Sequence, residues 1–216
     1  MRFDTILIDL DETIYESGNG LWGAIRDRMS DFMHVQLRFS MEEIPALRHS
    51  YYETYGTTLR GLQIHHQVDA DEFLAYVHDL PLAYYLQPDP ELHSLLHSLP
   101  QRKYIFTNAD SGHASRVLKA LEVSDCFVGI IDIRAMEFIC KPQPEAYRRA
   151  LEIMDQNDPR RCVYLDDIPK NLTPARKMGM FTVLVRNESV DSVADKTVSS
   201  LKDLPKSMPE LWEGII

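Results

Sequence analysis

Short apolar segments alternate with amphipathic stretches along most of this chain, and this alternation limits the possible folds more than any other feature. The apolar segments lie at residues 3–10, 103–107, 127–132, 162–165 and 181–185. Stretches with helical spacing of apolar residues lie at 111–121, 144–154 and 171–178. Apolar strands without polar alternation, separated by helices, are typical of βαβ units. The pattern therefore predicts an α/β domain with a parallel sheet and helices on both faces.

Residues 15–87 interrupt this pattern. They contain no convincing strand, but apolar residues recur at helical spacing in residues 21–39, 41–55 and 70–80. The segment is too long for a loop, and it ends at Pro88 and Pro90, which suit a linker. We therefore expect a core formed by residues 1–14 and 88–216, with a small all-helical domain inserted at residues 15–87.

The acidic composition narrows the possible partners. The 216 residues carry a formal net charge of -10 without a basic stripe, which argues against binding to a nucleic-acid polymer. No apolar run approaches the roughly 18 residues that span a bilayer, and the first residues do not resemble a secretory signal. The three cysteines form no CxxC pair. We expect a cytoplasmic protein with reduced thiols and no membrane association, and the sequence leaves monomer and homodimer equally open.

Two pairs of carboxylates follow predicted strands. Asp9 and Asp11 come after the first strand, and Asp166 and Asp167 after the fourth. The carboxyl ends of parallel strands open into the crevice where ligands bind. Residues two apart on an extended chain face the same way, so Asp9 and Asp11 point together into the site and call for a cation. Each pair alone is also ordinary turn chemistry, but together they predict a site for a hard cation such as Mg²⁺.

Thr107, Asn108 and Lys141 add groups that suit an anion. A hydroxyl and backbone N–H groups after the second strand can hold phosphate oxygens. Lys141 stands before Pro142 and a predicted helix start. Taken singly, Thr-Asn is equally good turn chemistry, and most lysines are solvated. Only the order of all four groups along one α/β domain favours a common site.

In that order, the four motifs resemble those of the haloacid dehalogenase (HAD) superfamily. They are IDLDETIY from residue 8, IFTN from residue 105, Lys141 within CKPQPEAY, and YLDDIPKN from residue 164. The resemblance covers nearly the whole chain, including a helical cap after the first motif. It implies a Rossmann-like three-layer α/β core with a parallel sheet, a C1-type helical cap, and Mg²⁺-dependent hydrolysis of a small phosphomonoester.

The resemblance also implies catalytic roles. Asp9 attacks phosphorus and forms an aspartyl-phosphate, while Asp11 protonates the leaving alcohol and then activates water. Thr107, the backbone at Asn108, and Lys141 neutralise the transferring phosphoryl group. An acid at position 11 favours phosphoester hydrolysis, because the halide leaving group of a dehalogenase needs no proton.

The metal site is implied in the same way. Asp9, the backbone carbonyl of Asp11 and Asp166 hold Mg²⁺. Asp167 is expected to orient either the motif lysine or the metal shell. Asn171 is expected to hydrogen-bond behind the ligands, or else to be no more than the first turn of a helix.

The segment YETYGTTLRGL from residue 52 indicates the substrate. It is similar to a segment of the pyrimidine 5'-nucleotidase-like branch of the superfamily, which implies a nucleoside monophosphate such as UMP or CMP. The alternatives are phosphoglycolate, a sugar phosphate, a sugar-phosphate mutase reaction, or a catalytically silent binding module, and the segment itself is otherwise a helix–helix connection. The residues expected to line the substrate pocket are Tyr15, Tyr52, Gly56, Thr57, Thr58 and Arg60.

Overall fold

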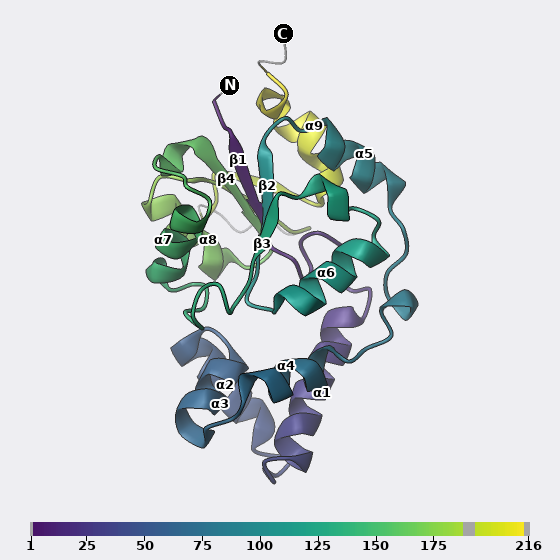
Figure 1. The fold of residues 1–216 in the computed structure, drawn as a ribbon, viewed down its shortest axis with the longest axis vertical. Coiled ribbons are helices and arrows are strands. Elements are labelled where there is room, and N and C mark those ends of the chain that lie inside the picture. Colours follow the sequence, from purple (N-terminus) through teal and green to yellow (C-terminus); the bar gives the residue numbers. More distant parts are fainter. Residues whose placement is uncertain (1, 188–192, 214–216) are drawn as a thin grey trace.

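The parallel sheet lies at the centre of the computed structural model, which describes residues 2–187 and 193–213 (Figure 1). Its strand order is β3-β2-β1-β4-β5-β6, and every neighbouring pair is parallel. The first strand of the chain is thus central, with β2 and β4 on either side. The strands span Thr5–Ile8 (β1), Arg102–Phe106 (β2), Gly129–Ile131 (β3), Cys162–Asp166 (β4), Phe181–Val185 (β5) and Lys196–Val198 (β6).

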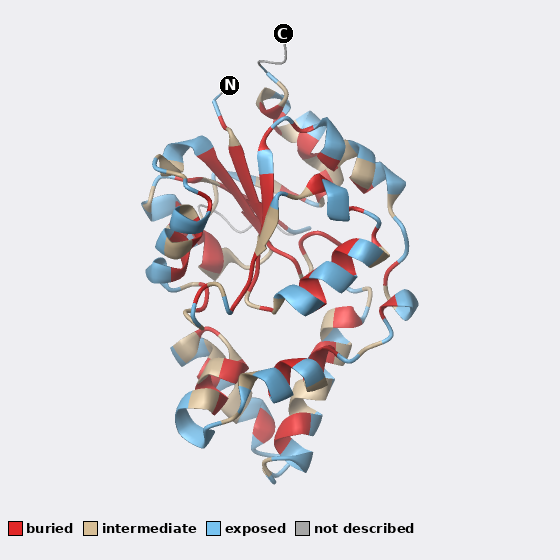
Figure 2. Ribbon diagram, viewed as in Figure 1, coloured by how far each residue is buried: buried red, intermediate tan, exposed pale blue. Residues whose placement is uncertain are grey.

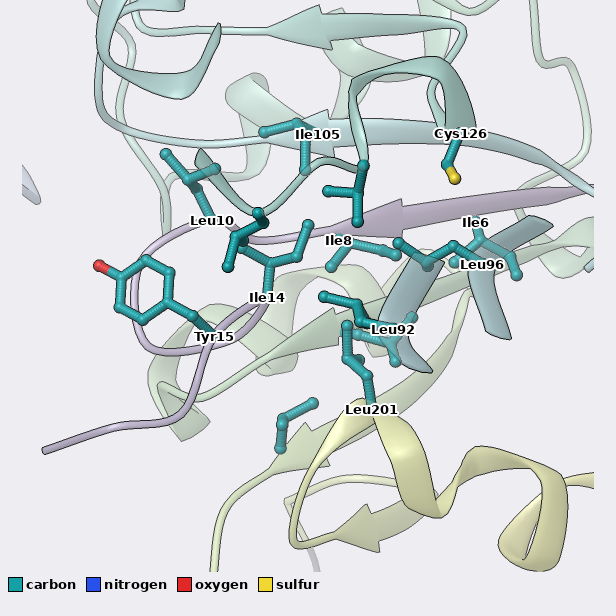
Figure 3. Packing of buried hydrophobic residues seen from close by; sticks show 14 of the residues in the cluster. Ile6, Ile8, Leu10, Ile14, Tyr15, Leu92, Leu96, Ile105, Cys126 and Leu201 are labelled. Atoms are coloured by element: carbon teal, nitrogen blue, oxygen red, sulfur yellow. The ribbon is translucent and has the colours of Figure 1, made fainter. Parts of the chain in front are cut away.

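Two helical layers cover the sheet, because both faces of the central strand are apolar. Ile6 and Ile8 pack on one face with residues of α5 and α6 (Figure 3). Leu7 packs on the other face with residues of α7 and α8. The strands of the sheet are mostly buried between these helices (Figure 2). The α/β class and the three layers are thereby confirmed. The core helices span Pro90–Ser98 (α5), Ser111–Ala120 (α6), Pro144–Ile153 (α7), Pro169–Lys177 (α8) and Leu204–Ser207 (α9).

Short 3-10 turns join several of these elements. One turn leads from the inserted segment toward the core, and others precede sheet strands or flank α9. They span Leu82–Tyr84 (η1), Ser124–Cys126 (η2), Pro159–Arg161 (η3), Leu201–Asp203 (η4) and Pro209–Leu211 (η5).

The inserted segment folds as helices with their own apolar cluster, at one end of the sheet (Figure 1). Phe32 of α1 meets Phe73 of α4 edge to face at 5.1 Å, and Leu62 of α3 is fully buried beside them. Ile133 and Cys140 of the core join the same cluster, so it continues across the junction. The helices span Leu21–Val35 (α1), Ile44–Tyr55 (α2), Thr58–His66 (α3) and Ala70–His78 (α4).

The sequence pattern did not predict α3. Gly56 ends α2 in the left-handed conformation, with φ +89°, and the next residue, Thr57, begins a new helix by accepting a hydrogen bond from Arg60 N at 3.1 Å. Gly61 weakened the helical signal, yet α3 requires glycine there, because a Cβ would lie 2.2 Å from the ring of Tyr51. Close packing between α2 and α3 thus overrides local propensity.

Candidate active site

Three neighbouring strands deliver the predicted site residues to one edge of the sheet. Ile8 of β1 pairs with Ile105 of β2 and Leu165 of β4, so these strands end at the same level. Asp9 follows directly after β1, and its backbone N–H bonds to Leu165 O at 2.9 Å. The residues that follow each strand therefore meet, as parallel pairing requires. They are Asp9 and Asp11 after β1, Thr107 and Asn108 after β2, and Asp166 and Asp167 at the end of β4.

Lys141 lies at the centre of this group, although it comes from the loop before α7. Its Nζ donates to Asp9 Oδ1 at 2.6 Å, to Asp166 Oδ2 at 3.0 Å and to the Phe106 carbonyl at 2.7 Å. Burial lowers the pKa of Lys141, but attraction by the two carboxylates outweighs it and leaves the pKa above its ordinary value. The lysine is thus a fixed, fully buried cation between two carboxylates.

Asp9, Asp166 and Asp167 form an acidic cluster, with ligand oxygens that all lie within 4.8 Å of one another. Burial, together with the nearby carboxylates, raises the pKa of Asp9 well above its ordinary value, and burial and Asp166 raise the pKa of Asp167 to about 7. One lysine compensates only part of this charge. Close oxygen donors with excess negative charge fit a divalent cation such as Mg²⁺.

Asp166 and Asp167 are held from different sides. The side-chain amide of Asn171 donates to both oxygens of Asp166, at 3.1 and 3.0 Å, as expected of a supporting residue. Asp167 instead contacts Thr13, whose hydroxyl lies 3.3 Å from Asp167 Oδ1 and 3.4 Å from Asp9 Oδ2. Asp167 therefore joins the acidic cluster, and among the described residues its side chain has no hydrogen bond to Lys141.

Thr107 and Asn108 lie beside the lysine. Thr107 is buried, and its hydroxyl accepts from Ala109 N at 3.0 Å. Asn108 uses its side chain to hold the backbone of Lys141: its amide donates to Lys141 O at 3.1 Å, and its oxygen accepts from Lys141 N at 2.9 Å. This reciprocal pair fixes the third motif to the second, a role for the side chain that the sequence did not indicate.

Asp11 is bound by two side chains. Tyr15 Oη donates to Asp11 Oδ1 at 2.7 Å, and His113 Nε2 lies 3.1 Å from the same oxygen. Burial raises the pKa of Asp11, but His113 and the two hydrogen bonds lower it more, so its net pKa falls. Tyr15 is buried and is absent from the lining of the cavity described next, so its expected place in a substrate pocket stays a prediction.

A cavity of about 520 Å³ extends from these residues to the inserted helices. Four of the expected substrate residues line it, namely Tyr52, Gly56, Thr57 and Thr58, whereas Arg60 faces Gln63 and lies outside the described lining. Gly56 approaches the core closely: a Cβ there would lie 2.6 Å from Lys141 O. Glycine thus permits contact between the two domains, where the sequence suggested contact with a ligand.

Sequence reasoning missed several residues of this site. His113 was overlooked, although its place in the first turn of the helix after β2 was an available signal. The cap side of the cavity includes cationic and aromatic side chains that had no recognisable motif, because helices α1, α2 and α4 bring them together only in the folded chain. These residues are Trp22, Arg26, Arg48, His49 and His78.

Known proteins of one family resemble this chain in sequence. A family model of haloacid dehalogenase-like hydrolases matches residues 3–179. Phosphate metabolism protein 8 of Saccharomyces cerevisiae is 32% identical over 190 residues, which cover 82% of this chain and 59% of the yeast protein. The chain thus spans about three fifths of the length of that relative.

Solved structures of similar fold come from several bacteria. CbbY of Rhodobacter sphaeroides, in complex with phosphate, matches with a TM-score of 0.66 and 20% identity, covering 94% of this chain and 96% of that one. The magnesium-bound hydrolase YfnB of Bacillus subtilis matches with a TM-score of 0.66 and 14% identity, covering 95% and 98%. L-2-haloacid dehalogenases match as well, so at these identities the likeness shows the fold alone.

Among the described residues, no helix is long and apolar enough to cross a membrane.

Proposed function

This chain belongs to the haloacid dehalogenase-like hydrolase family, and from that premise we propose that it hydrolyses small phosphomonoesters through an aspartyl-phosphate on Asp9. The observation that carries the proposal is the meeting of Asp9, Asp11 and Lys141 at the end of the central strand. Asp11 supports phosphoester hydrolysis over dehalogenation, because an alkoxide leaving group needs a proton and a halide does not.

The reaction proceeds in two displacements. A carboxylate oxygen of Asp9 bonds to phosphorus while the bond from phosphorus to the ester oxygen breaks, and Asp11 gives its proton to that oxygen. Water then attacks phosphorus, Asp11 takes a proton from the water, and the bond from phosphorus to Asp9 breaks. Phosphate leaves, and both carboxyl groups return to their starting states.

Asp9, Asp166 and the backbone carbonyl of Asp11 are the groups that would hold Mg²⁺, with Asp167 beside them. Their fit rests on the close oxygen donors and on the single lysine that only partly offsets the charge. When bound, Mg²⁺ supplies positive charge to the phosphoryl oxygens.

Lys141 and Thr107 serve the phosphoryl group directly. Lys141 holds Asp9 Oδ1 at 2.6 Å, which leaves Oδ2, near the Thr13 hydroxyl, as the oxygen available for attack on phosphorus. Its charge, with the Thr107 hydroxyl beside it, offsets charge on the transferring group. Because these groups are buried and already bonded, little reorganisation is needed during the reaction.

The substrate class that we propose first is a pyrimidine nucleoside monophosphate. Its support is the resemblance of the segment from residue 52, together with Tyr52, Thr57 and Thr58 in the wall of the cavity. An aromatic ring and two hydroxyls suit a base and a ribose. The cavity volume of about 520 Å³ lies within the roughly 300–1,000 Å³ typical of small-molecule sites.

A second substrate class has an observation of its own. Arg26 and Arg48 line the cap side of the cavity, and neither makes an ion pair with a carboxylate of the described residues. Two arginines without acidic partners suit a leaving group that carries a second anion, as phosphoglycolate does. Arg26→Gln is then expected to lower kcat/KM about tenfold for such an ester relative to an uncharged one. Arg38→Gln, an exposed cap arginine outside the described lining, is the control.

Phosphate release with Mg²⁺ across UMP, CMP, AMP, phosphoglycolate and sugar phosphates tests both classes. Preference for UMP and CMP in kcat/KM, lost on chelation and restored by added Mg²⁺, is the expected result. Preference for phosphoglycolate would support the proposed phosphatase activity but would assign phosphoglycolate as the substrate in place of a nucleotide. Transfer of phosphate within a sugar phosphate without net release would identify a mutase. Absence of turnover on every ester would contradict the proposed function.

A further inference from the structure

The two oxygens of Asp11 have different surroundings. Oδ1 lies 2.7 Å from Tyr15 Oη and 3.1 Å from His113 Nε2, and no hydrogen bond from the described residues reaches Oδ2. Beside a carboxylate, His113 bears its proton on Nε2 and the tyrosine donates its hydroxyl proton. Two donors directed at Oδ1 leave no room for a proton on that oxygen. Oδ2 is therefore the oxygen of Asp11 that is free to carry the transferred proton in the proposed reaction, and Asp11 lines the cavity together with Asp9 and Lys141.

His113 is held by both domains. On the core side it stands in the first turn of α6, where its backbone N–H donates to the capping Asp110 Oδ1 at 2.7 Å. On the cap side its ring stacks on His78 of α4, with centroids 4.1 Å apart and planes at 13°. Arg116 of α6 donates to the backbone carbonyl of His78, which joins the two helices. The His113 side chain is fully buried by these contacts.

These contacts link the cap to the acid of the reaction. We propose that His113 is a positioning residue, which together with Tyr15 holds Oδ1 of Asp11 so that Oδ2 alone presents the proton to the leaving group, and that His78 of the cap keeps the His113 ring in place. This inference rests on the proposed phosphomonoester hydrolysis. It adds a specific consequence: loss of His113 slows formation of the aspartyl-phosphate more for a leaving group that needs a proton than for one that does not. This difference is read from kcat/KM, because hydrolysis of the aspartyl-phosphate is common to both esters.

Leaving groups separate positioning of the acid from a general structural role. Glycerol phosphate releases an alkoxide that needs the proton, whereas p-nitrophenyl phosphate releases a stable anion that does not. His113→Asn shortens the side chain so that its amide no longer reaches Asp11, while His113→Gln retains a donor near the position of Nε2. His97→Asn, on the exposed face of α5, makes the same chemical change away from the site.

The expected result is selective. His113→Asn lowers kcat/KM for glycerol phosphate about 10- to 100-fold, part of the roughly 10²–10⁴ that acid–base catalysis contributes, and lowers kcat/KM for p-nitrophenyl phosphate at least about tenfold less. His113→Gln recovers most of the loss, and His97→Asn matches the wild type. Equal losses on both esters, or equal losses in the Asn and Gln variants, would overturn the positioning role. Lack of turnover by the wild-type protein on either ester would instead refute the proposed function, and this inference with it.

The contribution of the cap has a separate test. His78→Phe keeps an aromatic ring against His113, and His78→Ala removes it. The Ala variant is expected to lose kcat/KM on glycerol phosphate several-fold more than on p-nitrophenyl phosphate, whereas the Phe variant shows the smaller loss. Indistinguishable Ala and Phe variants would refute the part assigned to His78.

Discussion

The two ends of the cavity are built differently. At the sheet, Lys141 and Asp166 are almost completely buried, and each has several hydrogen-bonding partners within the core. At the cap, Arg26 and His49 are exposed, and Tyr52 is only half-buried. Dense polar contacts hold reacting groups in one geometry, while sparse contacts allow a wall to change with its ligand. This contrast supports the proposed division of roles, with the chemistry in the rigid core and substrate selection in the more adaptable cap.

The largest expected effect is on the core side. Asp9→Asn removes the proposed nucleophile and is expected to lower kcat by at least about 10⁴-fold. Because burial raises the pKa of Asp9, its ionised form destabilises the fold at neutral pH, so the variant is expected to unfold at the same temperature as the wild type or higher. Phosphate release and thermal unfolding measure the two effects. Asp155→Asn, at an exposed residue with φ +51°, is the matched control.

Substantial turnover by the Asp9→Asn variant would contradict the covalent mechanism. A large fall in its unfolding temperature would show instead that Asp9 stabilises the core, and the contrast between the two ends of the cavity would need another explanation.

Lys141→Met is expected to combine loss of activity with loss of stability. It leaves Asp9 and Asp166 buried without their cation, which costs about 3–5 kcal/mol of unfolding free energy. The destabilisation grows as pH rises, since the unpaired carboxylates ionise, and it shrinks at acidic pH. Urea unfolding at several pH values measures this trend. A pH-independent loss would show that packing of the side chain, and not its charge, is what the core requires.

Gly56→Ala tests the junction between the two ends. Gly56 has φ +89°, and the Cβ of an alanine there would lie 2.6 Å from Lys141 O. The substitution is therefore expected to cost about 1–3 kcal/mol of unfolding free energy. It is also expected to lower kcat, because it displaces the backbone of Lys141. Gly18→Ala is the control, because Gly18 has φ +87° and nothing within 4 Å of its Cβ position. Equal effects at both glycines would assign the cost to backbone strain alone and would weaken the proposed link between Gly56 and the catalytic lysine.

The smallest expected effect lies at the start of α6. Hydrogen bonds and the nearby histidines lower the pKa of Asp110 from 3.8 to about 2, despite an opposing effect of burial. A depressed pKa stabilises the fold above the ordinary value, and this stability is lost as pH falls from about 4 toward 2. After allowance for partial exposure, Asp110→Asn is expected to cost about 1 kcal/mol near neutral pH, since asparagine retains the helix cap. The difference between variant and wild type should vanish near pH 2, and its persistence there would assign the effect to the cap hydrogen bond.

Local patterns account for most of what was predictable. The apolar segments marked β1 to β5, five of the six strands of the described sheet, because a strand buried on both faces must be apolar throughout. Strand ends marked Asp9, Asp11, Thr107 and Asp166, since parallel strands carry their ligand-binding residues at one edge. Helix α3 was not predicted, because Gly61 lowers its helix propensity. The reason for this glycine is close packing against Tyr51 of α2, which a sequence pattern does not show.

By itself, the sequence determined the α/β class and the residues that end its strands, since hydrophobic periodicity and position after a strand are local properties. Only the tertiary structure decided that Tyr15 supports Asp11 and that His113 joins it from α6. Tyr15 lies four residues from Asp11 in an irregular turn, where spacing does not show which side chains meet, and His113 comes from a separate segment that meets Asp11 only after packing. The cap side of the cavity was likewise decided by the tertiary structure. Arg26 and Arg48 lie on different helices, and no sequence spacing indicates that both line the cavity. Functional residues that directly follow a strand can be predicted from the sequence. Functional contacts between two packed elements cannot, because they depend on how the whole chain packs.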